Sequence, residues 1–226
     1  MKRIAFYGGS FDPLHKGHLT IAKKISEQFD LDEFVFVPAF HAPHKKDKKP
    51  TSAFHRFAML ALATNDEHKI KVSKMELDIP ERPYTFETLS RLKNELVDTQ
   101  IFFVMGADSW VEITTWREWE KVLTLVNIIV VTRPGFEIGF SHVTDEIRER
   151  ILDLRNKLRI TNYELRENKA NSQFTNNDSL IYITDAVQID ISATEIRNQI
   201  RENAGDWQKD VPPEVAKYIE KYNLYI

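Results

Sequence analysis

Short apolar runs alternate with amphipathic stretches along the first 135 residues of this chain. Residues 4–7 form an apolar run that ends at Gly8-Gly9, as expected of a buried strand. Apolar side chains then recur at helical spacing over residues 19–29, and residues 34–37 form the next apolar run. A strand, a helix and a second strand within about 35 residues predict a parallel pair with a right-handed crossover.

The same alternation continues along the chain. It predicts helices at residues 54–63, 86–96, 116–126 and 145–158, and strands at residues 70–77, 101–105, 128–131 and 180–183. Two short helices are predicted to begin near Ser192 and Pro212, and the Asn-rich residues 167–179 are predicted to form a loop. Strands that alternate with helices predict an α/β fold, a doubly wound open parallel sheet with helices on both faces.

We expect a single domain over residues 1–226, with residues 136–180 as a candidate insertion and a small helical part at residues 192–226. A chain of 226 residues with 42% hydrophobic and 29% charged residues is ordinary for a globular protein. The absence of cysteine excludes disulfides, thiolate zinc sites, iron–sulfur clusters and cysteine nucleophiles.

Charge and hydropathy narrow the choice of partners. A formal net charge of -3 argues against non-specific binding to nucleic acid, which depends on neutralising phosphates. No apolar run approaches the roughly 20 residues that a membrane helix needs, and no signal-peptide core follows Met1-Lys2-Arg3. We therefore expect a cytoplasmic protein that contacts neither nucleic acid nor membrane.

The residues after the first predicted strand read GGSFDPLHKGH, over positions 8–18. In open α/β sheets, ligands bind at the carboxyl ends of the strands. The two glycines permit close backbone approach and positive φ, and His15 and His18 share one side of the first turn of a helix. The free N–H groups of that turn suit a phosphate.

For a His-x-x-His pair alone, a tight turn with two solvent-exposed histidines that cap a helix is the favoured interpretation. A metal site is the other alternative, but no carboxylate stands at the spacing of a zinc-peptidase motif, so metal ligation is disfavoured. Near the C-terminus, Ser192 and Glu195 have the spacing of a capping box, which by itself is a structural signal. Arg197 is placed in the first turn, where it opposes the helix dipole unless an anion binds there.

Taken together, these stretches resemble the nucleotidyltransferase superfamily. The pattern Gly-x-Phe-x-Pro-x-His-x-Gly-His is matched at six positions: Gly9, Phe11, Pro13, His15, Gly17 and His18. A second superfamily motif, Ile-Ser-Ser-Thr-x-Ile-Arg, corresponds to residues 191–197, with Ala193 in place of a serine. The resemblance implies a Rossmann-like fold and transfer of a nucleotidyl group from a nucleoside triphosphate, with release of pyrophosphate.

Further segments are similar to the nicotinate-nucleotide adenylyltransferase family. They are Gly106-Ala107-Asp108-Ser109-Trp110, residues 83–89 (PYTFETL) and the tryptophans that follow. The similarity covers residues 1–135 and 181–226. It implies that ATP and nicotinate mononucleotide are the substrates, that Mg²⁺ accompanies ATP, and that a homo-oligomer is possible.

The resemblance also implies roles for individual residues. The implied catalytic residues, which would stabilise the reacting phosphates, are His15, His18, Lys45 and Arg197. The implied contacts to ATP and its phosphates are Gly8, Gly9, Ser10, Phe11, Gly106, Asp108, Arg133 and Ser192. Thr85 and Trp116 would hold the nicotinate nucleotide, and no residue is implied to bind metal directly. Glu87 replaces a more usual Asp, and Arg117 stands where an aromatic often follows the tryptophan.

Each implied role has a simpler alternative. The tryptophans at 110, 116 and 119 could all belong to the core, and the lysines near position 45 could form a solvated loop. The solvated-loop interpretation is weakened because five of the 7 histidines fall in the first quarter of the chain, which favours an anion site there. Pantetheine-phosphate adenylyltransferase and a non-catalytic nucleotide sensor remain the competing functions.

Overall fold

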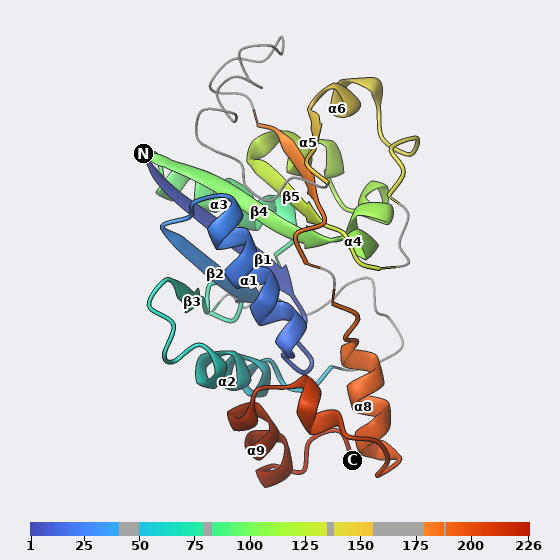
Figure 1. Ribbon diagram of the computed structural model, residues 1–226. Coiled ribbons are helices and arrows are strands. Elements are labelled where there is room, and N and C mark those ends of the chain that lie inside the picture. Colours follow the sequence, from blue (N-terminus) through green and yellow to red (C-terminus); the bar gives the residue numbers. More distant parts are fainter. Residues whose placement is uncertain (41–49, 79–82, 135–137, 156–178, 188) are drawn as a thin grey trace.

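The computed structural model describes residues 1–40, 50–78, 83–134, 138–155, 179–187 and 189–226. Its centre is one seven-stranded sheet in which every pair of neighbouring strands is parallel (Figure 1). The strands are β1 (Lys2–Gly9), β2 (Glu33–Pro38), β3 (Ile70–Val72), β4 (Thr99–Gly106), β5 (Asn127–Val131), β6 (Ile151–Asp153) and β7 (Ile181–Thr184). Their order is β3-β2-β1-β4-β5-β7-β6, which confirms the predicted open parallel sheet.

The strand order contains one reversal that matters for function. The chain moves outward from β1 to β2 and β3, and then returns to place β4 on the other side of β1. Loops that leave β1 and β4 therefore turn to opposite faces of the sheet. The gap between them is where an open α/β sheet binds its ligands.

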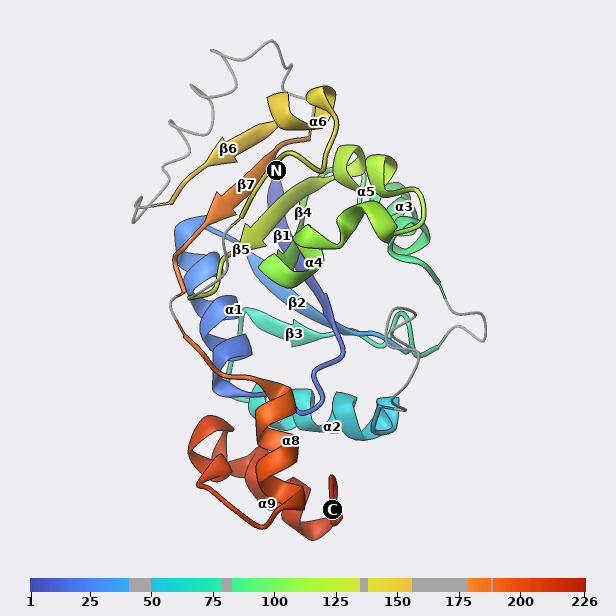
Figure 2. The ribbon, with the colours of Figure 1, turned by 90° about the vertical axis from the view of Figure 1, so that its right-hand side faces the viewer.

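Helices cover both faces of the sheet (Figure 2). The helices are α1 (Lys16–Gln28), α2 (Ala53–Ala63), α3 (Thr85–Glu95), α4 (Ala107–Val111), α5 (Trp119–Leu125), α6 (Asp145–Glu149), α8 (Ala193–Arg201) and α9 (Pro213–Lys221), with 3-10 turns η1 (Ile113–Thr115) and η2 (Trp207–Asp210). Helix α1 lies on one face, and α3, α4 and α5 lie on the other, as a doubly wound sheet requires. Helices α2, α8 and α9 gather beyond the carboxyl ends of β1 and β2.

Side-chain alternation along the strands divides the apolar residues into two cores. In β1, Ala5 and Tyr7 belong to the core under α1, whereas Ile4 and Phe6 belong to the core under α3, α4 and α5. All four side chains are buried, which explains why this segment is a continuous apolar run in the sequence.

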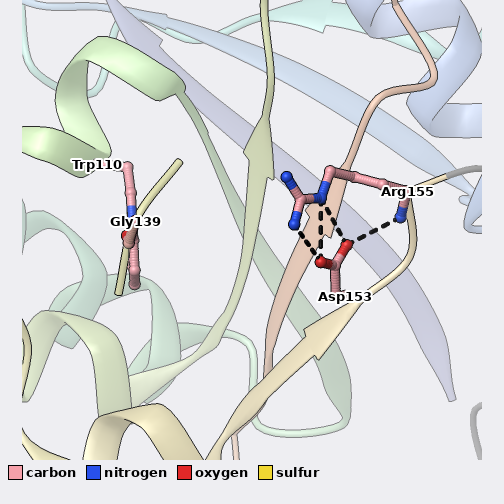
Figure 3. A network of polar contacts seen from close by, with 4 residues as sticks. All are labelled: Trp110, Gly139, Asp153 and Arg155. Atoms are coloured by element: carbon pink, nitrogen blue, oxygen red, sulfur yellow. Dashed lines mark hydrogen bonds and ion pairs between the residues drawn. The ribbon is translucent and has the colours of Figure 1, made fainter. Parts of the chain in front are cut away.

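The predicted helix over residues 145–158 is wrong beyond its first turn. Helix α6 ends at Glu149, and residues 151–153 form the edge strand β6, which pairs with β7 from Ile181 to Ile183. The reason is that three backbone residues find parallel partners there, and Leu154 is still buried. At the end of β6, Arg155 folds back onto Asp153: its backbone N–H and its Nε lie 3.1 and 2.9 Å from Oδ1 of Asp153 (Figure 3).

Two other boundaries differ from expectation. The predicted helix at 116–126 begins only at Trp119, because Trp116 is extended and Glu118 is left-handed, with φ 54°. The predicted strand at 70–77 stops at Val72. Across the part of the chain that the structure describes, no helix is both long enough and apolar enough to span a bilayer.

Candidate active site

The loop between β1 and α1 takes its shape from Phe11. This residue adopts the left-handed conformation, with φ 49°, and its buried ring packs edge-on against Tyr7 and His18 at centroid distances of 5.3 and 5.1 Å. Positive φ, which the glycine residues Gly8 and Gly9 would permit, occurs instead at Phe11. Gly9 is needed for space: a Cβ there would lie 2.8 Å from Cζ of Phe11. The ring of Phe11 is buried, so its side chain is not available to a ligand.

The two motif histidines are stacked at the start of α1. Their ring centroids are 3.6 Å apart, and the backbone N–H of His15 donates to Nδ1 of His18 at 3.2 Å. Because Nδ1 of His18 accepts this bond, the neutral ring carries its proton on Nε2, which is then a donor. Gly17 lets the His15 ring sit close to the helix, since a Cβ at Gly17 would lie 3.0 Å from Nδ1 of His15.

The predicted capping is confirmed, because His15 is the N-cap of α1 and His18 accepts its N–H, but the predicted solvent exposure is wrong, since both histidines are buried. Their exposed fractions are 3% for His15 and 8% for His18. Burial, and after it the field of Arg133, lower the pKa of His15 to about 3. Burial, then His15 and Arg133, hold the pKa of His18 well below its usual range. In the free protein both rings are therefore neutral hydrogen-bonding groups at pH 7, not cations.

A pocket opens at the reversal point between β1 and β4. Its lining comes from β1, the start of α1, the ends of β4 and β5, and the segment after β7: Tyr7, His15, Gly17, Ile21, Gly106, Val131, Thr132, Arg133, Val187, Ile189 and Ile191. Nδ1 of His15 is a buried nitrogen without a hydrogen-bond partner. Arg133 brings the positive charge to this lining. The structure thus collects three of the predicted residues, His15, Gly106 and Arg133, around one pocket.

The other predicted ATP contacts are not among the residues that line this pocket. Asp108 is exposed in the first turn of α4, and its carboxylate folds over Gly106, where a Cβ would lie 2.5 Å from Oδ1 of Asp108. Gly8 and Ser10 are partly exposed at the end of β1 and in the following loop. Ser192 is exposed just before α8.

The C-terminal motif meets the first loop through Arg197. Its guanidinium donates to the backbone carbonyl of Asp12 at 2.5 Å and to Oγ1 of Thr194 at 3.1 Å. The two motifs therefore converge in space across 185 positions of the sequence. Through this bond Arg197 holds the loop that carries the histidines. It is not among the residues that line the pocket.

Two details of the C-terminal prediction are wrong. The hydroxyl of Ser192 makes no cap bond, so the predicted capping box is absent, and Glu195 instead accepts from Nε2 of Gln199 at 3.3 Å. Arg197 is the fifth residue of α8 and so lies beyond the first turn. Arg197 therefore does not oppose the helix dipole, because that effect fades within a turn.

Sequence reasoning missed Arg56, which holds the loop from the other side. Its side chain is 1% exposed and donates to the carbonyls of Ser10, Ala39 and Thr51 at 2.6, 2.7 and 3.0 Å. A single arginine inside the apolar run of α2 was the available signal.

The residues predicted to hold the nicotinate end lie on the face of the sheet that α3, α4 and α5 cover. Thr85 begins α3 and is partly exposed, as is Trp116, which packs against the core on that face. Arg117 joins their two segments, since its guanidinium lies 3.7 Å from Glu87 and 4.9 Å from the ring centre of Tyr84. The two departures from the family pattern, Glu87 and Arg117, thus contact each other.

Trp110 is a core residue, in agreement with the simpler interpretation. It is 0% exposed, and its Nε1 donates to the carbonyl of Gly139 at 3.0 Å (Figure 3). Lys45 lies outside the described residues, as do His41 and His44. Within the described ranges, no three His, Cys, Asp or Glu side chains are grouped so that they could hold a metal ion.

Comparison with known proteins agrees with this geometry. The cytidylyltransferase-like family model matches residues 6–199. A protein of Desulfatibacillum aliphaticivorans, named "Probable nicotinate-nucleotide adenylyltransferase", is 36% identical over 229 residues, which cover 99% of this chain and 100% of the relative. A protein of the same name from Clostridium botulinum (strain Alaska E43 / Type E3) is 35% identical and covers 100% of this chain and 98% of its own length.

The chain belongs to the nicotinate-nucleotide adenylyltransferase family. A solved structure supports the fold of this family member: the nicotinic acid mononucleotide adenylyltransferase of Plasmodium falciparum, complexed with NaAD, superposes with a TM-score of 0.73. The match covers 100% of this chain and 98% of the other, at 24% sequence identity. The two segments that resemble nucleotidyltransferase motifs are joined here by the bond from Arg197 to Asp12.

Proposed function

We propose that this protein joins ATP and nicotinate mononucleotide to give deamido-NAD and pyrophosphate. The observation that carries the proposal is the pocket at the reversal point, where a buried imidazole and the Arg133 guanidinium share one lining. Full-length relatives named for this reaction favour it over pantetheine-phosphate adenylyltransferase.

In the proposed reaction, a 5′-phosphate oxygen of nicotinate mononucleotide attacks the α-phosphorus of ATP in line. The new O–P bond forms as the bond from the α-phosphorus to the bridging oxygen of pyrophosphate breaks. No covalent enzyme intermediate is needed, so the protein's task is to position the phosphates and stabilise charge.

Particular groups are suited to that task. The Nε2–H of His18 and the His15 ring are neutral hydrogen-bond donors. Because they are neutral, no charge has to be buried before the substrate binds. Arg133 supplies fixed positive charge, and Lys45 is proposed to add more from its own segment. Thr85 and Trp116 are proposed to hold the pyridine ring, with Trp116 stacked on it.

Mg²⁺ is proposed to arrive bound to the triphosphate as part of the substrate. The described residues offer no carboxylate or histidine cluster for a resident ion, and Mg²⁺ keeps several of its waters in such complexes. Its chemistry would be to neutralise charge on the triphosphate oxygens.

One assay tests the proposal. The protein is incubated with MgATP and either nicotinate mononucleotide or nicotinamide mononucleotide, and released pyrophosphate and dinucleotide are measured. Formation of deamido-NAD with stoichiometric pyrophosphate is expected with the acid substrate. Binding of MgATP without release of pyrophosphate from ATP, with either mononucleotide present, would favour the nucleotide sensor.

A further inference from the structure

Tyr7 stands in the pocket without a role in the reaction proposed above. It is the third residue from the end of β1, its side chain points to the α1 face, and it lines the pocket with His15 and Arg133. We infer that the hydroxyl of Tyr7 contacts the substrate, donating a hydrogen bond to an oxygen of the ATP triphosphate. This inference rests on the proposed function, because it assigns the triphosphate to this pocket.

The ring of Tyr7 is held by aromatic neighbours, so the position of its hydroxyl is fixed. The ring centroid lies 5.3 Å from Phe11, 5.8 Å from Phe36 and 6.1 Å from Phe34, and the residue is 6% exposed. These contacts are made by carbon atoms. A phenylalanine would therefore fill the same space, and packing alone does not explain why a hydroxyl is present.

The hydroxyl makes no hydrogen bond within the described part of the molecule, although the ring around it is buried. The hydroxyl oxygen is not among the buried atoms that lack a partner, so it is not shut off from solvent. Tyr7 borders the pocket, so a ligand there could supply the missing acceptor.

The electrostatic surroundings suit a donor to an anion. Arg133 lies near enough to influence the phenol, and Asp108 acts in the opposite direction. Burial raises the pKa of Tyr7 far above neutrality. The phenol therefore keeps its proton at pH 7 and can donate it in a hydrogen bond, but it is unsuited to act as a general base.

The test is Tyr7→Phe, which removes one oxygen atom and keeps the ring. The matched control is Tyr182→Phe. Tyr182 is buried in the same core, on the same row of the sheet across β4 and β5, and its hydroxyl also lacks a partner, but it does not line the pocket. Both variants are compared with the wild type by urea unfolding, by calorimetric titration with MgATP and by steady-state kinetics.

We expect Tyr7→Phe to weaken MgATP binding and to lower kcat/KM for ATP by about 10- to 100-fold, the range for a hydrogen bond to a charged group. The KM for nicotinate mononucleotide and the urea midpoint should stay at wild-type values, and Tyr182→Phe should match the wild type in every kinetic measurement. A Tyr7→Phe protein with unchanged MgATP affinity and unchanged kcat/KM overturns the inference, as does an equal loss in Tyr182→Phe.

The same measurements separate this inference from the proposed function. A wild type that binds MgATP but releases no pyrophosphate refutes the proposed reaction, and the MgATP affinity of Tyr7→Phe still decides the role of the hydroxyl. A wild type that binds no MgATP overturns both.

Discussion

The hydroxyl of Tyr225 donates a 2.8 Å hydrogen bond to Oδ1 of Asp12, across 213 positions of the sequence. The other carboxylate oxygen of Asp12 accepts from the backbone N–H of Thr51 at 3.2 Å, and its carbonyl accepts from Arg197. One residue of the histidine loop is thus fastened to three separate segments. None of the three residues that bind Asp12 lines the pocket.

This fastening predicts the behaviour of Tyr225→Phe. The variant loses one hydrogen bond to a carboxylate, and such a bond typically contributes about 1.5–3 kcal/mol. The free energy of unfolding should therefore decrease by about that amount. The kcat should fall because the loop that carries His15 and His18 is less restrained. Urea unfolding and steady-state kinetics measure both effects. Tyr222→Phe, at a residue 47% exposed, is the control and should change neither.

Substitution of His18 should separate its structural role from its chemical role. His18→Ala should lower kcat by about 10²–10³, the cost of losing one donor in an oxyanion-type site. In His18→Asn, the side-chain oxygen can still accept the His15 N–H while the Nε2 donor is lost. We therefore expect His18→Asn to unfold like the wild type in urea but to turn over as slowly as His18→Ala. Wild-type turnover in His18→Asn would contradict the role of Nε2.

Trp116 is predicted to act on one substrate only. Trp116→Ala should raise the KM for nicotinate mononucleotide by more than the KM for ATP, because it removes the stacking surface for the pyridine ring. Trp116→Phe keeps part of that surface and should lie between the wild type and Trp116→Ala. Initial rates over a grid of both substrates give the two constants, and equal changes in both would argue against stacking at this position.

The buried histidines predict acid instability of the free protein. The pKa of His15 is about 3 in the folded state and about 6.5 when unfolded, so between these pH values the unfolded chain binds more protons. The stability contributed by the neutral ring is fully present above pH 6.5 and is lost as the pH falls. The shifted pKa of His15 alone should lower the free energy of unfolding by about 2–3 kcal/mol between pH 7 and pH 4.5.

Urea midpoints at pH 7 and pH 4.5 test this dependence. The difference between them should shrink in His15→Asn and remain in His68→Asn, which alters an exposed histidine. Burial raises the pKa of Glu76 to about 7, so this carboxyl has the opposite pH dependence and loses stability as the pH rises. Because Glu76 is common to all three proteins, comparison between them removes its effect. An equal pH dependence in His15→Asn and the wild type would contradict the prediction.

Features that depend on residues close together in the sequence could mostly be predicted, whereas features that depend on distant residues could not. The β1–loop–α1 unit was predictable because its glycines, its two histidines and the apolar run lie within the first 30 residues. Strand β6 was not, because a three-residue strand is recognised only by its pairing with β7. Arg56 was missed because the carbonyl of Ser10 that it binds is 46 positions away. The prediction of a capping box was wrong because Ser192 has the right spacing but its hydroxyl makes no cap hydrogen bond.

The bonds from Arg197 and Tyr225 to Asp12 close the two longest chain loops among the contacts described for this site. Contacts between residues about 200 positions apart are non-local, and such contacts tend to form late in folding. The sheet can therefore assemble before its histidine loop is fastened. During refolding, a native-like fluorescence or circular dichroism signal should appear before substrate-binding competence, which arrives with the docking of the last helices.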